Sequence, residues 1–241
     1  DESFTTLGSL ERFYGKPWFS LGDRDLATHL YRSDRMRAGA PLSTVTGEIA
    51  DAFGVKSRVL PMSDDSVRTF VKIRGREAVP FQEYFVRGRA RGAVEKIELR
   101  GIEHARPLPA ALDAIRKSAA IILAPSNPFV SLGPIFALRG LRNELRAVRD
   151  RIAAISPIVG GRTVKGPADK MLRGLGLEVS ALGVARLYQD IAGTFVVDNS
   201  DHDLKPAVEN LGMRVVVTDT IMSSPARAGR LAQVVLNALG V

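Results

Sequence analysis

A repeated pattern in the second half of the chain constrains its fold more than any other feature. Short apolar runs rich in β-branched residues end at turn clusters, at 119–124, 151–155, 194–197 and 215–217. Helix-like stretches follow them, at 135–149, 167–175, 180–191, 204–211 and 225–239. Such alternation predicts parallel strands with helices packed on the sheet. We therefore expect an α/β fold of the Rossmann-like, doubly wound kind, with a mostly parallel sheet.

Residues 40–105 interrupt this pattern. They contain one helix-like stretch at 43–53 and β-like runs at 57–60, 67–73, 79–86 and 94–99. We expect an inserted α+β subdomain at 40–105, with 1–39 and 106–241 forming the Rossmann-like nucleotide-binding domain. The Gly/Arg-rich stretch 87–92 has the composition of a mobile connector, so a solvated loop is favoured over an anion-gripping one.

Composition narrows the classes of function. The chain has 241 residues and no cysteine, which excludes a disulfide scaffold, a thiolate zinc site and a Cys nucleophile. Its apolar runs fall short of the ~20 residues that cross a bilayer, and its acidic start is unlike a signal peptide. We expect no membrane association and a cytoplasmic setting. The net charge of +8 favours an anionic partner. The basic residues are scattered and not interleaved with aromatics, which argues against nucleic acid.

The loop after the first predicted strand is a candidate anion site. Ligands of open parallel sheets bind at the carboxyl ends of the strands. Ser126 and Asn127 follow that strand directly, and Ser131 stands just before a predicted helix. Hydroxyls, an amide and free N–H groups at a helix start favour a phosphate. A plain turn with Ser131 as N-cap explains the same residues equally well.

The loop after the second predicted strand is a second candidate. It supplies Gly160, Gly161 and Lys165 in a segment long enough to fold over a ligand. It lacks the Gly-Lys-Ser/Thr order of a Walker loop, and a generic Gly-rich surface loop is the alternative. No nucleophile–base pair stands out, so direct transfer of a phosphoryl-type group fits better than covalent catalysis.

Carboxylates form three small groups, at 23–25, 64–65 and 198–203. Mg²⁺ is bound by one or two such oxygen ligands together with substrate phosphates, which makes Asp64 and Asp65 candidate ligands. Asp23 and Asp25 flank Arg24 just before a predicted helix. This triplet suits an anionic or hydroxyl-bearing substrate, or forms a salt-bridged helix start. Lone Asp residues are more often caps and turn formers than ligands.

Several of these segments together resemble the 2-phospho-L-lactate transferase family. The matching motifs are WFSLGDRDLATH (18–29), LPMSDD (60–65), FQEYFV (81–86), PSNP (125–128), SLGPI (131–135), SPIVGG (156–161), VKGP (164–167) and TDTIM (218–222). The resemblance runs from about residue 18 to the C-terminus. The family's initial strand and Gly-rich loop have no counterpart here, so we expect the chain to be the latter three-quarters of such an enzyme.

The resemblance implies a specific reaction. Members transfer a phosphoenolpyruvyl or 2-phospho-L-lactyl group from a guanosine diphosphate-linked donor to the ribityl hydroxyl of the deazaflavin Fo. GMP is released, Mg²⁺ is the cofactor, and the product belongs to coenzyme F-420 biosynthesis. The Ala/Arg/Val-rich composition resembles actinobacterial members, which look like phosphoenolpyruvyl users. The family also implies a homodimer.

The resemblance also assigns roles to the candidate residues. The guanosine diphosphate part of the donor would be held by Ser126, Asn127, Ser131, Gly160, Gly161 and Lys165. Arg24, with Asp23 and Asp25, would face the deazaflavin and its attacking hydroxyl. Asp64 and Asp65 would bind Mg²⁺ or accept the hydroxyl proton, and Arg24 or Lys165 would balance charge on the bridging oxygen.

Two other functions stay open from the sequence. One is a noncatalytic or regulatory nucleotide-binding protein on the same sheet, and the other is a guanine-nucleotide-dependent transferase that does not use a deazaflavin. An acceptor pocket would discriminate, because a flat tricycle needs apolar walls. Trp18, Phe19, Phe81 and Phe85 are candidates for those walls, although core packing accounts for them as well.

Overall fold

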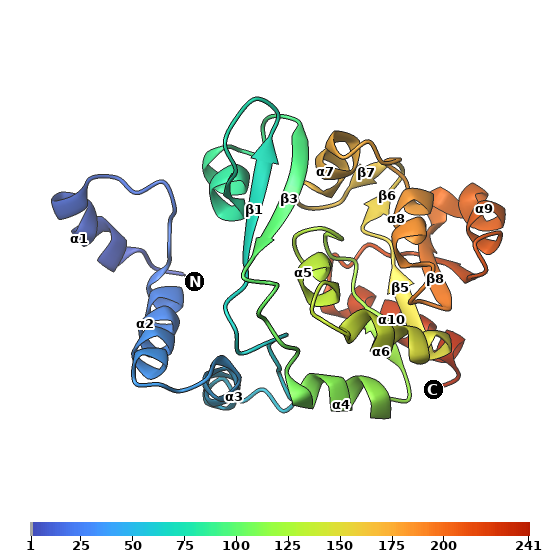
Figure 1. The fold of residues 1–241 in the computed structure, drawn as a ribbon, viewed down its shortest axis with the longest axis horizontal. Helices are drawn as coiled ribbons and strands as arrows, with labels where there is room; N and C mark the ends of the chain where they lie inside the picture. Colours follow the sequence, from blue (N-terminus) through green and yellow to red (C-terminus); the bar gives the residue numbers. More distant parts are fainter. Residues whose placement is uncertain (1) are drawn as a thin grey trace.

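The chain begins with three helices that lie at one end of the molecule. The structure, a computed structural model, describes residues 2–241 (Figure 1). The helices are α1 (Thr5–Tyr14), α2 (Asp23–Arg37) and α3 (Leu42–Ala52). Neither α1 nor α2 has a buried residue, whereas α3 buries Val45 and Ala50. Figure 1 shows α1 and α2 on the left, away from the parallel sheet.

A small antiparallel sheet follows within the predicted insertion. Its strands are β1 (Arg68–Ile73), β2 (Val79–Pro80) and β3 (Val94–Arg100), in the order β2-β1-β3. The apolar side chains of this sheet pack against helix α7 (Ala168–Gly174). A Cβ on Gly174 would lie 2.6 Å from the carbonyl oxygen of Val94, so only glycine permits this close approach.

Two β-like runs of the insertion do not form strands as predicted. Residues 57–60 lie outside any strand, and the run at 79–86 gives only the two-residue β2 before a π-helical turn over Glu83–Arg87. Phe81 and Phe85 stack with ring centroids 5.6 Å apart, while Tyr84 is buried. These aromatics recur at helical spacing of three and four residues, which outweighed their individual preference for strands.

The four strands predicted for the second half all form. They are β4 (Ile121–Leu123), β5 (Ile152–Ile155), β8 (Thr194–Asp198) and β9 (Arg214–Thr218). Adjacent strands pair in parallel, in the order β4-β5-β8-β9. A short antiparallel hairpin, β6 (Ile158–Val159) with β7 (Arg162–Thr163), follows β5.

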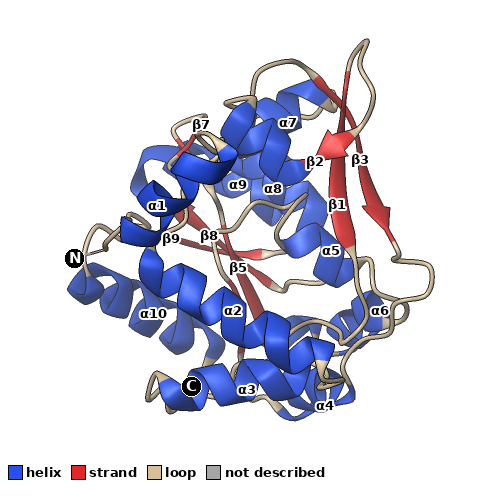
Figure 2. Cartoon of the chain, turned by 90° about the vertical axis from the view of Figure 1, so that its left-hand side faces the viewer, coloured by secondary structure: helices blue, strands red, loops and turns tan. Residues whose placement is uncertain are grey.

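Helices cover both faces of the parallel sheet. Ile152 and Ala154 of β5 belong to one buried cluster, whereas Ala153 and Ile155 belong to another that includes Leu231 of α10 (Pro225–Leu239). Because successive strand residues point to opposite faces, an apolar run of this kind needs cover on each side. Figure 2 shows β5, β8 and β9 between helices, with α10 on one side. The Rossmann-like α/β fold is confirmed.

The remaining helices connect the strands. They are α4 (Pro109–Lys117), α5 (Leu132–Phe136), α6 (Leu141–Ala147), α8 (Ala181–Tyr188) and α9 (Lys205–Glu209), with 3-10 turns at Arg149–Arg151 and Asn199–Leu204. The single helix expected at 135–149 is wrong. α5 ends at Phe136, and Gly140, at φ 82°, is the N-cap of α6, so a left-handed residue stands where one continuous helix was expected.

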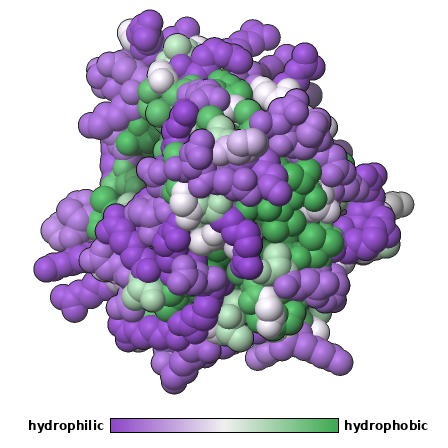
Figure 3. All heavy atoms as spheres, turned by 90° about the vertical axis from the view of Figure 1, so that its right-hand side faces the viewer, coloured by the Kyte–Doolittle hydropathy of each residue, from purple (hydrophilic) through white to green (hydrophobic). Residues whose placement is uncertain are grey.

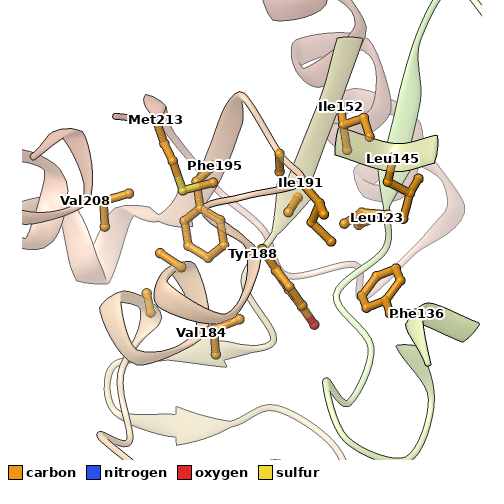
Figure 4. Close-up of a cluster of buried hydrophobic side chains, with 14 of the residues drawn as sticks. Leu123, Phe136, Leu145, Ile152, Val184, Tyr188, Ile191, Phe195, Val208 and Met213 are labelled. Carbon is orange, nitrogen blue, oxygen red and sulfur yellow. The ribbon is translucent and has the colours of Figure 1, made fainter. Parts of the chain in front are cut away.

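The main core lies under α8. Tyr188 meets Phe136 edge-on with ring centroids 5.8 Å apart, and Figure 4 shows both rings beside Leu123 and Ile191. The outer face on the α9 side is mainly hydrophilic, with hydrophobic atoms in smaller patches (Figure 3). Among residues 2–241, no helix combines the length and apolarity needed to cross a bilayer.

Candidate functional site

A pocket of about 370 Å³ opens at the carboxyl edge of the parallel sheet. Its walls come from segments that follow three of the four strands and from the chain after the β6–β7 hairpin. The lining residues are Pro125, Ser156, Pro157, Val159, Val164, Lys165, Thr220, Ile221, Met222 and Ser223. This is the edge at which open parallel sheets bind ligands, as the sequence predicted.

A buried carboxylate fixes one wall of this pocket to the end of β8. Asp198 ends β8 and accepts hydrogen bonds from the Thr220 N–H at 2.9 Å and the Thr220 hydroxyl at 3.1 Å. It also accepts bonds from the N–H and hydroxyl of Ser200. Burial acts to raise the pKa of Asp198, but these hydrogen bonds outweigh it and lower that pKa below its ordinary value. The ends of β8 and β9 are thereby fixed to each other.

A second buried carboxylate anchors the β6–β7 hairpin. The turn is Gly160-Gly161, at φ 55° and 73°, which suits a two-residue hairpin turn that needs positive φ at both positions. Asp201 accepts a hydrogen bond of 3.0 Å from the Gly160 N–H. Burial raises the pKa of Asp201, and the Asp198 charge adds to the shift. The glycines therefore shape the hairpin, and the N–H of Gly160 is already bonded within the protein.

Lys165 brings positive charge to the pocket, as predicted. It lies in the exposed loop between β7 and α7 and lines the pocket beside Val164. The end of that loop is fixed because the Asp169 N–H donates to the Thr163 hydroxyl at 2.8 Å. A flexible ammonium at the rim of a strand-edge pocket is suited to a phosphate oxygen.

The loop after β4 carries Ser126, Asn127 and Ser131, which follow the pocket residue Pro125 in the sequence. The Asn127 side-chain oxygen accepts bonds from the backbone N–H groups of Phe129 at 2.9 Å and Val130 at 3.3 Å. Asn127 therefore builds the turn. Ser131 occupies the N-cap position of α5, as the alternative interpretation of this loop expected, but its side chain makes no cap bond. Neither Ser126 nor Ser131 lines the pocket, although the adjacent Pro125 does.

The Asp23 carboxylate caps a neighbouring helix. It accepts hydrogen bonds from the Ser3 hydroxyl at 2.7 Å and from the N–H groups of Thr5 and Thr6 at 3.0 Å, at the start of α1. The Ser3 hydroxyl and the Thr6 N–H lower the pKa of Asp23 to about 2. The Arg24 N–H donates to the Glu2 carboxylate at 3.1 Å.

The predicted triplet of Asp23, Arg24 and Asp25 thus forms the first turn of α2, where it was expected to stand just before the helix. In the view of Figure 1, α2 lies at the left and the β6–β7 hairpin at the right. The triplet is not brought into the lining of the strand-edge pocket.

The Asp64-Asp65 pair also makes structural bonds. Asp64 accepts from the N–H and hydroxyl of Ser43 at 2.6 and 3.0 Å, in the first turn of α3. Asp65 accepts through Oδ2 from the Arg106 N–H at 2.8 Å, which ties the segment before β1 to the segment after β3. Within residues 2–241, no three His, Asp or Glu side chains are grouped so as to hold a metal ion. The Mg²⁺ role of the pair stays a prediction.

Sequence reasoning left Ser156 and Thr220 out of the site, although both line the pocket. Their position directly after strands was the available signal. What was missing was the sheet order, which places the ends of β5 and β9 on either side of β8.

A mainly apolar pocket with a few polar groups, at the carboxyl edge of a helix-covered parallel sheet, is the usual ligand site of a Rossmann-like α/β protein. A family model described as 2-phospho-L-lactate transferase CofD matches residues 5–229. The chain belongs to this family. The resemblance found in the sequence is confirmed, and it supports a transferase role in coenzyme F-420 biosynthesis.

Individual relatives carry two different names. The chain is 37% identical over 238 residues to a 2-phospho-L-lactate transferase from Methanosarcina mazei, covering 99% of this chain and 78% of the relative. It is 40% identical over 237 residues to a phosphoenolpyruvate transferase from Thermobifida fusca, covering 96% and 72%. Sequence identity to these relatives therefore does not indicate whether the donor carries a lactyl or an enolpyruvyl group.

One solved structure supports the fold alone. The crystal structure of protein BH3568 from Bacillus halodurans superimposes with a TM-score of 0.62 at 16% identity. The similarity covers 90% of this chain and 72% of that protein.

Proposed function

We propose that the chain transfers a phosphoenolpyruvyl or 2-phospho-L-lactyl group from a guanosine diphosphate-linked donor to the terminal ribityl hydroxyl of Fo. GMP is the second product. The observation that carries this proposal is the strand-edge pocket with Lys165 at its rim, in a chain of the CofD family. A pocket of about 370 Å³ lies within the usual size range of ligand sites.

The reaction needs positioning and charge stabilisation more than covalent chemistry. The hydroxyl oxygen of the acceptor forms a bond to the phosphorus that carries the lactyl or enolpyruvyl group. The bond from that phosphorus to the bridging oxygen breaks, and GMP leaves with that oxygen. The hydroxyl proton passes to a base, for which Asp64 and Asp65 are the candidates. The Lys165 ammonium stabilises negative charge that develops on the bridging oxygen.

We propose that the glycines and the loop after β4 shape the donor site and do not contact the donor themselves. Gly160 and Gly161 form the hairpin turn that leads to Lys165, because the N–H of Gly160 is bonded to Asp201. Asn127 holds the turn that carries Ser126, and Ser131 follows it. We assign Lys165 the direct phosphate contact, with the other residues shaping the walls around it.

Asp65 fits Mg²⁺ better than Asp64 does. Both Asp64 oxygens accept hydrogen bonds from Ser43, whereas Asp65 uses only Oδ2 among the described residues. Oδ1 of Asp65 keeps its lone pairs, and Mg²⁺ is commonly held by one carboxylate with waters and phosphates. When bound, the ion neutralises phosphate charge.

The proposed binding site for the acceptor Fo is argued from exposed aromatic side chains. Trp18 is 48% exposed and Phe85 is 37% exposed, so core packing does not account for them. Phe81 and Phe85 are stacked, and Phe19 lies edge-on to Trp18. Flat aromatic faces of this kind suit a tricyclic deazaflavin. Arg24 with Asp23 and Asp25 is proposed to face the acceptor. A homodimer in the cytoplasm, with no nucleic-acid or membrane partner, completes the proposal.

The decisive experiment is a product assay by mass spectrometry. The protein is incubated with Mg²⁺, Fo and each guanosine diphosphate-linked donor in separate reactions. GMP and the phosphodiester product are expected from one donor. GDP affinity is measured in parallel by calorimetry, with Lys205→Ala as control because Lys205 is an exposed lysine of α9 outside the pocket. GDP binding without product from either donor would point to a noncatalytic nucleotide-binding protein or to another guanine-nucleotide-dependent transferase.

A further inference from the structure

A second hollow, of about 540 Å³, lies between the antiparallel sheet and α7. We call it the basic cleft. Its lining residues are Arg74, Ala90, Arg91, Gly92, Ala93, Lys170, Arg173 and Gly174. Four of these carry positive charge and none carries negative charge. The cations come from three separate segments of the chain, so only the fold brings them together.

None of these four cations forms an ion pair. Within residues 2–241, no carboxylate oxygen lies within 4.0 Å of the charged nitrogens of Arg74, Arg91, Lys170 or Arg173. Some arginines elsewhere are paired, as Arg142 is with Asp190 at 2.6 Å, but what distinguishes the cleft is that four cations line one hollow that no carboxylate lines. Like charges repel when they converge without counterions, so such an arrangement favours an anionic ligand.

The rim of the basic cleft is the loop 87–92, which is mostly exposed to solvent as the sequence predicted but is held at Ala90 and Gly92. Ala90 is 5% exposed, and its N–H donates to the Tyr84 carbonyl at 2.9 Å. Its carbonyl accepts from the Lys170 ammonium at 3.3 Å. Gly92 has φ 96°, and a Cβ there would lie 2.6 Å from the Ile73 side chain. These contacts fix the arginines of this loop relative to α7.

A neighbouring hollow of about 430 Å³ shares Arg91 with the basic cleft but is mixed in charge. Glu77 and Glu83 line it together with Arg76, Arg87 and Tyr84, and Arg87 pairs with Glu83 at 3.2 Å. The Tyr84 side chain is buried at 1% exposure, yet its hydroxyl has no hydrogen-bond partner in the part of the chain that the structure describes. A buried hydroxyl without a partner is costly.

We infer that the basic cleft binds an oligophosphate anion, such as a diphosphate, a triphosphate or the polyphosphate end of a nucleotide. Guanidinium groups bind phosphate oxygens with paired N–H donors, and Lys170 adds a point charge. The lining has no aromatic side chain on which a base would stack, so the phosphates are the recognised part. The site is separate from the Lys165 pocket and does not depend on the proposed function.

Hydrogen–deuterium exchange with sodium tripolyphosphate tests this inference at the level of individual segments. The wild-type protein is compared with the double variant Arg91→Ala/Lys170→Ala. The control is Arg139→Ala, an exposed arginine between α5 and α6 outside the cleft lining. Thermal unfolding of each variant without ligand establishes that it is folded.

In the wild type and the control, tripolyphosphate is expected to slow exchange in peptides covering 86–93 and 168–176. In the double variant the apparent Kd at these peptides is expected to rise by about tenfold or more, because two charge-assisted contacts are lost. Protection confined to peptides covering 156–166 and 218–223 would place the anion in the Lys165 pocket and overturn the inference. Tighter binding of a thymidine oligonucleotide than of tripolyphosphate would overturn it in favour of single-stranded nucleic acid.

Discussion

Thr220 donates two hydrogen bonds to Asp198, from its backbone N–H at 2.9 Å and from its hydroxyl at 3.1 Å. Asp198 is 5% exposed, and Thr220 lines the strand-edge pocket. The pair therefore connects the interior of the sheet with the wall of the site. A substitution of Asp198 is therefore expected to change both the stability of the protein and the shape of the pocket.

Asp198→Asn is expected to destabilise the protein. The amide keeps the shape but replaces a carboxylate that accepts four bonds, so the loss is about 1–3 kcal/mol in the free energy of unfolding. Urea unfolding measures it. The control is Asp203→Asn, because the Asp203 side chain is 90% exposed. Equal effects of both variants would contradict the role of Asp198.

The lowered pKa of Asp198 also predicts in which direction the free energy of unfolding changes at acidic pH. Its folded pKa is lowered, so its contribution is present above the unfolded pKa of about 4 and is lost as pH falls through the lower folded value. The wild type is expected to lose stability more steeply below pH ~4 than Asp198→Asn does. Urea unfolding over a pH series compares the two slopes, and parallel slopes would count against this linkage.

Asp23→Asn separates a helix cap from a substrate contact. If the side chain only caps α1, amide exchange at Thr5 and Thr6 quickens while turnover and Fo affinity stay unchanged. A role in acceptor binding predicts loss of Fo affinity as well. Because the pKa of Asp23 is lowered to about 2, the cap is expected to persist below pH 3.8 and to be lost near pH 2. Exchange that is as slow in the variant as in the wild type would exclude the cap.

Lys165→Ala is expected to weaken donor use far more than Fo binding. Loss of one charge-assisted phosphate contact corresponds to about 1.5–3 kcal/mol, or roughly tenfold or more in GDP affinity. Calorimetry with GDP and with Fo measures both affinities, and Lys205→Ala serves as the control. Equal losses for the two ligands would remove the assignment of Lys165 to the donor.

Two glycine substitutions are expected to act in opposite directions. Gly160→Ala places a side chain at φ 55° in the hairpin turn and is expected to cost about 1 kcal/mol. Gly229 is at an exposed position of α10, and no atom lies within 4 Å of a Cβ added there. Gly229→Ala is therefore expected to stabilise the protein by about 0.5–1 kcal/mol. Thermal unfolding of each variant provides the comparison. Stabilisation by Gly160→Ala would show that the turn does not need positive φ there.

Asp64→Asn tests whether this carboxylate only holds Ser43 or also takes part in binding Mg²⁺. A purely structural carboxylate at the start of α3 is expected to cost about 1 kcal/mol of stability with or without Mg²⁺. Asp65→Asn is the matched change. If Mg²⁺ is held by this pair, stabilisation of the protein–GDP complex by Mg²⁺ falls in the Asp65 variant. Identical Mg²⁺ responses in wild type and both variants would assign the pair to structure alone.

Much of the fold was readable from the sequence because its signals are local. The strand β9 and the helix α10 stand where the apolar runs at 215–217 and 225–239 indicated. The errors fall where several local signals competed. Phe81, Tyr84 and Phe85 each favour strands, but their joint spacing and burial produce a π-helical turn. Gly140 divides a helical pattern that hydrophobic spacing alone made continuous.

The sequence by itself determined the class of fold, the family motifs and the presence of Lys165 after the second strand of the sheet, because periodicity and residue type are properties of short segments. Only the tertiary structure decided which polar groups remain free for a ligand. Gly160, Asp23, Asp64 and Asn127 look like site residues in the sequence, yet their hydrogen bonds join segments or close turns within the fold. The four cations of the basic cleft, in contrast, come from three segments and meet without a carboxylate among the described residues. Whether a polar side chain meets a protein partner or a ligand depends on packing between distant segments, and that information is absent from any local pattern.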